Sequence, residues 1–416
     1  MISVQQALEQ ILSAISPLGS ERVSLLAALG RVAAEDVDAR RAIPPRDNSA
    51  MDGYALRWED TLGATRESPV ILEVVEDIPA GKVPEKTVVA GTAARIMTGA
   101  PIPDGADAVM KMEETEKDGS RVRIFAAASA GLDIRRAGED VRPGERIVRK
   151  GDVLTPARIG MLASVGRAVI DVHQRPTVAV LATGNELVDV DEAFLTEGKI
   201  VSSNSYSLAA QVLDCGAVPL QIGIARDTRE DLIAKFNAAL RADIILSSGG
   251  VSVGDYDLVK EIMKEVGNRM QFWQVAMRPG KPLAFGTLGG VPLFGLPGNP
   301  VSSMVSFEQF VRPALLKMMG RRNLFRRIIQ ACLDEDVQKH AGARNFLRAR
   351  VEFRDGRYHA STTGEQGSGI LKSMVLANGL IVIPEAVTHA RAGEEVTVQL
   401  IDGSLEGMAE PEYLKD

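Results

Sequence analysis

The chain has 416 residues, 45% of them hydrophobic and 25% charged, which fits a globular protein of roughly two to four domains. Its net charge of −7 disfavours general nucleic-acid binding, while two distant cysteines and four scattered histidines predict neither a disulfide framework nor a structural zinc site. A membrane-spanning helix needs about 18 consecutive apolar residues, and no apolar run is that long. The first residues indicate a helix rather than a signal peptide. We therefore expect a cytoplasmic protein.

The N-terminal end of the chain predicts two helices. Apolar residues recur at helical spacing over residues 3–15, with Ser3 as the N-cap. Residues 24–34 predict a second, short helix that ends near Arg31, before two consecutive prolines break the chain.

Residues 45–170 have a different texture. Short alternating runs typical of strands lie at residues 70–76, 87–96, 108–112 and 122–126. Clusters of Pro, Gly and Asp separate these runs, as between the strands of a β domain. Residues 155–165 predict a helix with Pro156 in its first turn.

From about residue 173, strands alternate with helices. Apolar strand-like runs lie at residues 177–182, 218–224, 244–246 and 292–296. Helical patterns lie at residues 203–214, 228–239, 257–266 and 300–319. This alternation predicts a parallel α/β sheet covered by helices on both faces. The tail returns to strand-like alternation at residues 326–333, 345–353, 379–383 and 395–401.

The chain is therefore expected to be multidomain, of α/β plus β class. Residues 1–172 form an N-terminal region with a helical start and β-rich subdomains, in which residues 45–142 are an inserted module. Residues 173–322 form a central α/β domain with a parallel sheet, and residues 323–416 form a small C-terminal β domain.

Two glycine-rich loops follow buried strands of the α/β domain. Main-chain N–H groups of such loops bind anions, and open α/β sheets bind ligands at the carboxyl ends of their strands. We expect the loops to form a cradle for an anionic ligand, in which glycine lets the main chain approach closely. The cradle residues are Ser248, Gly249, Gly250, Ser252, Pro297, Gly298, Asn299, Pro300 and Ser302.

Carboxylates follow the strand ends beside this cradle. Glu186 follows the first α/β strand and Asp227 the second, and Asp255 and Asp257 follow the third. Each alone is equally typical of a solvated turn. Beside a bound anion they favour Mg²⁺, which binds one or two carboxylates plus ligand oxygens. Whether Asp255 or Asp257 faces the metal stays open.

Basic residues lie near the same sheet. Arg278 and Lys281 form either a solvated turn or an oxyanion site, in which Lys supplies a point charge and Arg a bidentate grip. In the tail, Arg344 begins a charged strand that is typical of a solvated face. Ser368, between two glycines before a short helix over residues 371–378, is a candidate for binding a small oxyanion.

Three motifs of the N-terminal region place small or acidic residues beside glycine. They contain Asp52, Thr98 and Asp140. Each alone is typical of a structural turn. They reach the cradle only if the domains fold onto each other or if a second subunit supplies them.

The ordered set of motifs resembles the MoeA-type molybdopterin molybdenumtransferases, relatives of the E domain of gephyrin and of its plant counterpart. The motifs are Asn48-Ser-Ala-Met-Asp-Gly-Tyr-Ala55, Ile96-Met-Thr-Gly-Ala-Pro101, Gly138-Glu-Asp140, Thr183-Gly-Asn-Glu-Leu187, Ser248-Gly-Gly-Val-Ser-Val-Gly254, Pro279-Gly-Lys-Pro282 and Gly295-Leu-Pro-Gly-Asn-Pro-Val-Ser302. Each is weak alone, but the set covers nearly the whole chain in the expected order.

The resemblance implies an elongated homodimer of four-subdomain chains, whose central domain binds molybdopterin. It implies insertion of molybdate into adenylylated molybdopterin with Mg²⁺ and release of AMP, downstream of a molybdopterin adenylyltransferase. The family's site lies between the α/β domain of one subunit and the N-terminal β domain of the other, with no nucleic acid or membrane as partner.

The resemblance also assigns roles to residues. The catalytic positions are Asp52, Thr98, Asp140, Glu186, Asp227 and Asp257. The metal ligands among them are Glu186, Asp227 and Asp257. The molybdate ligands are Arg278, Lys281, Arg344 and Ser368, and Lys281 also joins the cofactor-binding cradle. The chain departs from the family at Asn185, where Asp is common, and at Gln274, where some relatives have Lys.

Two alternative functions are weaker. A non-catalytic scaffold, or a divergent paralogue that only binds molybdopterin or tungstate, has no need for the acidic set. A generic nucleotide-binding enzyme such as a kinase is disfavoured because no Gly-x-x-x-x-Gly-Lys-Ser/Thr motif is present. Molybdate and tungstate share size and charge, so the sequence does not discriminate between them.

Overall fold

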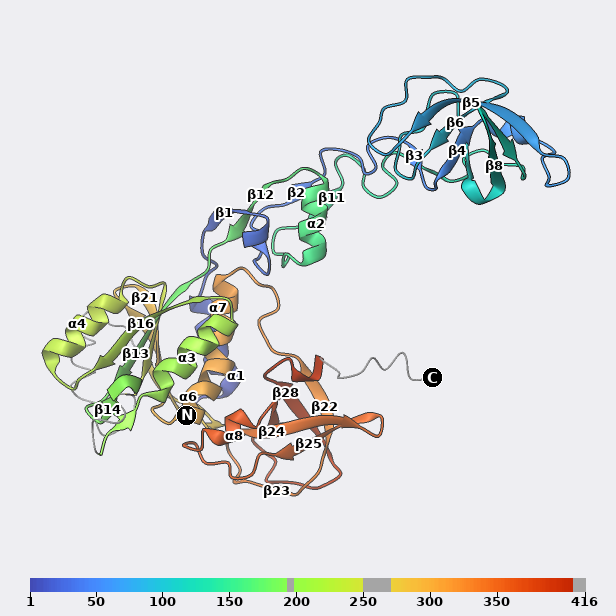
Figure 1. Ribbon diagram of the computed structural model, residues 1–416. Coiled ribbons are helices and arrows are strands. Elements are labelled where there is room, and N and C mark those ends of the chain that lie inside the picture. The colour runs from blue at the N-terminus through green and yellow to red at the C-terminus, as the bar shows by residue number, and fades with distance from the viewer. Residues whose placement is uncertain (193–197, 250–270, 407–416) are drawn as a thin grey trace. The chain divides into compact units, whose positions relative to one another are not determined.

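The computed structural model describes residues 1–192, 198–249 and 271–406. The chain forms two compact units (Figure 1). The larger contains residues 1–21 and 173–416, and the smaller contains residues 22–172. Each has buried apolar clusters of its own. In the described ranges, no helix is both long enough and apolar enough to cross a membrane.

A six-stranded sheet forms the centre of the larger unit. Its spatial order is β16 (Val218–Ala225), β13 (Thr177–Thr183), β17 (Ile244–Ser248), β21 (Val291–Leu296), β20 (Pro282–Leu288) and β18 (Gln271–Gln274). The first four strands are parallel, as the alternation of strands and helices predicts. Their carboxyl ends therefore lie along one edge of the sheet, where a ligand site is expected.

The sequence analysis predicts only these four strands and misses the last two, β20 and β18. β20 is antiparallel to β21, and β18 is antiparallel to β20. Gly289 and Gly290 join β20 to β21, with φ angles of 54° and 89° that suit a two-residue hairpin turn. Such a short turn joins only antiparallel strands. The reversal brings the start of β20 to the same edge as the end of β21.

Helices cover both faces of this sheet (Figure 1). α4 (Arg229–Ala239) covers one face, where Phe236 is fully buried. The other face carries α1 (Val4–Ala14), α3 (Ser203–Asp214) and one long helix. The long helix consists of α6 (Pro300–Ser306), a π-helical turn (Phe307–Val311) and α7 (Arg312–Met318).

Two of the predicted helices are confirmed in detail. α1 begins after Ser3, which forms a capping box with Gln6. α3 has the bounds that the periodicity predicts. Both pack their apolar faces into the same core as the sheet, which is where an amphipathic helix gains most of its stability.

A second six-stranded sheet lies in the C-terminal part of the larger unit. Its order is β19 (Met277–Arg278), β24 (Arg344–Arg354), β25 (Arg357–Thr362), β22 (Ile328–Leu333), β28 (Glu395–Leu400) and β26 (Gly379–Ile383). A short pair, β23 (Val337–Gln338) with β27 (His389–Ala390), and the helix α8 (Lys372–Val375) complete it. β19 comes from the α/β part of the chain, so main-chain hydrogen bonds join the two parts.

The smaller unit is β-rich, as predicted. Its main sheet has the order β7 (Ala108–Lys111), β4 (Gly53–Leu56), β6 (Thr92–Ile96), β5 (Val70–Ile78), β9 (Arg121–Ile124) and β8 (Thr115–Asp118). The predicted helix over residues 155–165 is confirmed as α2 (Pro156–Ser164) with Thr155 as its N-cap.

The second predicted helix, over residues 24–34, is wrong. Only a single 3₁₀ turn forms, over Leu26–Ala28. Gly30 then takes a φ angle of 74° and donates its N–H to the carbonyl oxygen of Leu154. This contact with a distant segment replaces the hydrogen bonds that would have continued the helix.

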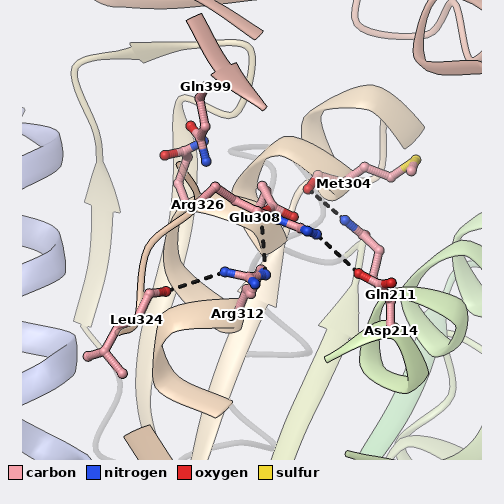
Figure 2. A network of polar contacts seen from close by, with 9 residues as sticks. Gln211, Asp214, Met304, Glu308, Arg312, Leu324, Arg326 and Gln399 are labelled. Carbon is pink, nitrogen blue, oxygen red and sulfur yellow. Dashed lines mark hydrogen bonds and ion pairs between the residues drawn. The ribbon is translucent and has the colours of Figure 1, made fainter. Parts of the chain in front are cut away.

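A buried ion-pair network holds the long helix against its surroundings (Figure 2). Glu308, in the π-helical turn, is only 7% exposed and accepts a hydrogen bond from Arg326 Nε at 2.7 Å. Arg326 also donates to Asp214 of α3 at 3.1 Å. The Nε atom of Arg312 lies 3.6 Å from the same Glu308 oxygen. Burial, and then the charge of Arg326, hold the pKa of Arg312 below its ordinary value.

Replacing Glu308 by Ala leaves two arginines of the larger unit without their shared carboxylate. We expect the unfolding free energy of that unit to fall by about 3 kcal/mol, the scale for breaking a buried pair. The chain has two tryptophans, Trp58 and Trp273, one in each unit. In a Trp58→Phe background, the fluorescence of Trp273 therefore reports the larger unit alone.

The matched control for this variant is Asp214→Asn, because Asp214 is 66% exposed at the end of the network. It should change the unfolding free energy by less than about 1 kcal/mol. Equal effects of the two variants would contradict the central role of Glu308.

Candidate functional site

Two glycine loops meet at the carboxyl edge of the α/β sheet. Gly249 follows β17 and donates its N–H to the carbonyl oxygen of Leu296 at the end of β21, at 3.1 Å. Its φ angle is +90°, and a Cβ there would lie only 2.8 Å from the carbonyl oxygen of Thr183. A Cβ on Gly298 would lie 3.9 Å from the Cα atom of Gly249. The main chains of three neighbouring strand ends thus approach closely, as predicted for a cradle.

Asn204, in the first turn of α3, joins the two loops. Its Nδ2 atom donates to Ser248 Oγ at 2.7 Å and to the carbonyl oxygen of Gly298 at 2.8 Å. Its Oδ1 atom is buried and has no hydrogen-bond partner in the described part of the chain. The sequence analysis missed Asn204, because nothing local distinguishes it from the other polar residues that begin a helix.

The acidic side of the edge follows β13 and β16. Asp227 Oδ2 accepts the N–H of Asn185 at 3.0 Å, and Asn185 Oδ1 accepts the N–H of Asp227 at 3.1 Å. This reciprocal pair explains why Asn can replace the more common Asp at position 185. An amide oxygen accepts a hydrogen bond as a carboxylate oxygen does, and it does not repel Asp227. The carboxylate of Glu186 lies directly over Gly184, where a Cβ would collide with it.

The basic turn lies at the other end of the same edge. Ala284 pairs with Gly295, which places Lys281, just before β20, beside the loop that follows β21. Gly280 packs on the long helix, because a Cβ there would lie 2.5 Å from Ser306 Oγ. Arg278 lies in β19 and pairs with Asn345 of β24. Both cations are therefore held by main-chain geometry.

A cavity of about 530 Å³ lies at this turn, and we name it the basic cavity. Its lining includes Arg278, Lys281, Asn299, Ser302 and Ser368. The C-terminal part contributes Ser368, whose carbonyl oxygen accepts the N–H of Val301 at the start of α6, at 3.1 Å. Five of the predicted ligand-binding residues thus line one cavity of a size that suits a small ligand.

Arg348 is the residue that the sequence analysis missed in this region. It is fully buried (0% exposed) and lines a second cavity, of about 880 Å³, that shares Arg278, Asn345 and Gln366 with the basic cavity. Its Nε donates to Ser373 Oγ at 3.0 Å and its Nη2 to the carbonyl oxygen of Gly367 at 3.2 Å. Burial lowers the pKa of Arg348 to about 10, so it stays charged at neutral pH.

No carboxylate of the described residues pairs with Arg348, Arg278 or Lys281. Of the three only Arg348 is buried, since Arg278 and Lys281 are exposed, and burying a charge without a counterion is costly. An anion in the adjoining cavities would supply the missing counterion. By contrast, Arg344 forms an ion pair with Glu385 at 3.2 Å and does not line these two cavities. The alternation of β24 could have predicted that Arg348 is buried, because Arg348 lies on the same face of the strand as buried Phe346.

The smaller unit brings Asp52 and Thr98 together. Gly53 of β4 pairs with Ile96 of β6, so the residues beyond each are neighbours. Asp52 Oδ1 accepts hydrogen bonds from both the N–H and the hydroxyl of Thr98, each at 2.7 Å. These two bonds, the main-chain one first, hold the pKa of Asp52 below its ordinary value. Asp140 is exposed in the same unit and donates its N–H to the carbonyl oxygen of Ile43.

Four predicted positions, Gly250, Ser252, Asp255 and Asp257, lie outside the described residues. Within the described ranges, no group of three His, Cys, Asp or Glu side chains forms a metal cluster. Pro297 and Pro300 flank Gly298 and Asn299 between β21 and α6, and Pro300 is the first residue of that helix.

Comparison with known proteins identifies the family. Residues 2–166 match the family model of the MoeA N-terminal region (domains I and II), residues 179–317 that of a probable molybdopterin binding domain, and residues 330–401 that of the MoeA C-terminal region (domain IV). A molybdopterin molybdenumtransferase 2 from Mycobacterium tuberculosis is 41% identical over 404 residues, with 95% of this chain and 97% of the relative covered. The chain belongs to the MoeA family.

Further relatives agree with this membership. A molybdopterin molybdenumtransferase from Nostoc is 38% identical, with 96% of this chain and 93% of the relative covered. The crystal structure of a molybdopterin biosynthesis MoeA protein from Pyrococcus horikoshii OT3 matches with a TM-score of 0.81 and 33% identity, over 96% of this chain and 100% of that chain. The resemblance drawn from the motifs is confirmed.

The Asp52–Thr98 contact in this MoeA-family chain is testable by substitution. Thr98→Val removes the hydroxyl donor and keeps the main-chain donor, so the pKa of Asp52 should rise toward its ordinary value. The carboxylate would then take up a proton at a higher pH than in the unmodified chain. A ¹³C NMR titration of the Asp52 carboxyl group measures this shift.

The matched control is Thr98→Ser, which retains the hydroxyl and should leave the pKa of Asp52 unchanged. A Thr98→Val variant that titrates like the unmodified chain would show that the hydroxyl contributes nothing to Asp52.

Proposed function

We propose that the chain inserts molybdate into adenylylated molybdopterin and releases AMP, as a transferase of molybdenum cofactor biosynthesis. Family membership and the names of relatives that are 36–41% identical support this reaction class. The observation that carries the proposal for this chain is the buried Arg348, without a carboxylate partner in the described residues, in a cavity with Arg278, which also lines the basic cavity with Lys281. Tungstate, with the same size and charge, would be accepted by the same cations.

The oxyanion would bind where the basic cavity meets the second cavity, at Arg278, which lines both. Lys281 supplies a point charge, Arg278 and Arg348 supply forked donors, and Ser368 supplies a hydroxyl. We place Arg348 in the role that the sequence assigned to Arg344, because the Glu385 carboxylate already neutralises Arg344. The glycine cradle beside the cavity would bind phosphate oxygens of the pterin substrate through main-chain N–H groups.

Glu186 and Asp227 would hold Mg²⁺. They follow adjacent strands, and two carboxylates plus ligand oxygens are the donor set that Mg²⁺ prefers. Bound there, the metal would supply charge stabilisation for the leaving phosphate oxygen. The Asn185–Asp227 pair fixes the orientation of the Asp227 carboxylate, so the protein contributes mainly positioning and electrostatics. Asp257 is proposed as the third acidic residue of this group.

Asp52, Thr98 and Asp140 would complete the site from a second copy of the chain. They lie in the smaller unit, whereas the cradle and both cavities lie in the larger. In line with the family resemblance, we propose a homodimer, working in the cytoplasm downstream of a molybdopterin adenylyltransferase. The sequence regions proposed for it are residues 1–172, 173–322 and 323–416, and the first 21 residues pack in the larger unit.

The oxyanion role of Arg348 can be tested by Arg348→Met. Loss of a charge-assisted hydrogen-bond donor should weaken molybdate binding about tenfold to hundredfold in equilibrium dialysis. The melting temperature should not fall strongly, because an apolar side chain replaces a buried, uncompensated charge.

Arg350→Met is the matched control, since Arg350 lies on the same strand but is 69% exposed and paired with Glu352. It should bind molybdate normally. Unchanged molybdate binding by Arg348→Met would overturn the assignment of Arg348.

The reaction itself can be tested with adenylylated molybdopterin, Mg²⁺ and molybdate or tungstate, measuring AMP release and metal incorporation. Asp227→Asn keeps the shape of the side chain and removes its charge. It should slow AMP release about a hundredfold or more, the scale for losing one electrostatic group of an active site. Substrate binding without turnover by the unmodified chain would instead support the non-catalytic scaffold.

A further inference from the structure

The amide orientation of Asn204 is determined by its surroundings. The side chain faces the carbonyl oxygen of Gly298, which can only accept a hydrogen bond. The atom nearest to it must therefore be Nδ2, and the same Nδ2 donates to Ser248 Oγ. Asn204 is 8% exposed and Ser248 is 3% exposed, so water does not readily replace either contact.

This orientation determines the role of the Ser248 hydroxyl. The Ser248 oxygen accepts a hydrogen bond from Asn204 Nδ2, so the hydroxyl hydrogen of Ser248 must point to another atom. Among the described residues, the Ser248 hydroxyl accepts from Asn204 and makes no hydrogen bond as a donor. A buried hydroxyl proton without an acceptor costs free energy, which an oxygen of a bound ligand would recover.

We propose that Asn204 is a positioning residue that turns Ser248 into a hydrogen-bond donor for an anionic phosphate oxygen of the substrate. The inference rests on the proposed function and deepens it, because it names the group that the Ser248 loop recognises. Asn204 acts through Ser248, and at the same time it joins Ser248, the last residue of β17, to Gly298.

The inference explains why an amide is needed at this position. A carboxylate of the same shape would accept a hydrogen bond from the Ser248 hydroxyl. The hydroxyl would then no longer donate to the ligand. It would also face the Gly298 carbonyl oxygen with like charge and place a negative charge beside an anion site. Only the amide donates to both neighbours.

The test compares Asn204→Asp, Ser248→Ala and the double variant. Each single variant should raise KM for adenylylated molybdopterin about tenfold to hundredfold, the scale for a hydrogen bond to a charged group, with a smaller effect on kcat. The double variant should lose less than the product of the two single effects, because both changes remove the Ser248 donor, although Asn204→Asp also loses the Gly298 contact and adds a charge. Effects that multiply in the double variant would overturn the inference.

Asn378→Asp is the matched control. Its side chain also accepts from and donates to the main chain, at Val351, at 2.7 and 2.9 Å. It should lower the melting temperature without raising KM. An equal rise of KM in both Asn→Asp variants would assign the effect to general destabilisation and overturn the inference.

Dissociation constants for AMP, measured by calorimetry on the same variants, separate this inference from the proposed function. If the unmodified chain binds AMP but never releases AMP from the adenylylated substrate, the transfer reaction is contradicted and the role of Asn204 is not. AMP binding that Asn204→Asp and Ser248→Ala each weaken, with a combined loss in the double variant smaller than the product of the two, would still support Asn204. Unaltered AMP affinity together with unaltered KM in Asn204→Asp would overturn it.

Discussion

The main-chain pairing of β19 with β24 is the interaction on which the rest of the site depends. The chain leaves the sheet that contains β18 and β20, pairs for two residues with the C-terminal sheet, and returns. Arg278 and Lys281 lie in and after that excursion. Hydrogen bonds between main chains set their positions whatever the neighbouring side chains are. The basic cavity forms because residues 271–288 contribute β18 and β20 to one sheet and β19 to the other.

The larger unit contains two kinds of buried charged site, one with a carboxylate counterion and one without. Around Glu308, two arginines share one buried carboxylate, and the network contributes to stability. Around Arg348, hydroxyl and carbonyl oxygens orient the guanidinium group but do not neutralise it. A site that must bind an anion cannot also hold a permanent counterion. The uncompensated charge is therefore a stability cost that is consistent with binding, as functional sites often show.

The local parts of the site could be predicted because their chemistry is local. Gly249 and Gly298 are needed where strand ends approach closely, and the glycine pattern predicts this directly. The Gly289-Gly290 turn also carried a clear hairpin signal, and missing it left β20 and its antiparallel pairing with β21 out of the predicted sheet. The 3₁₀ turn at Leu26–Ala28 was not predictable in this way, because the competing hydrogen bond comes from Leu154, far along the chain.

The sequence by itself determined the family, the alternation of the four parallel strands with helices, and the residue types proposed to surround an anionic ligand. These follow from periodicity and from motifs whose residues are close together in the chain. Only the tertiary structure decided that Arg348 rather than Arg344 lacks a carboxylate partner in the described residues, and that Asn204 contacts both Ser248 and Gly298. The physical reason is that burial and pairing depend on segments far apart in the chain, and a single sequence contains no record of which of them meet.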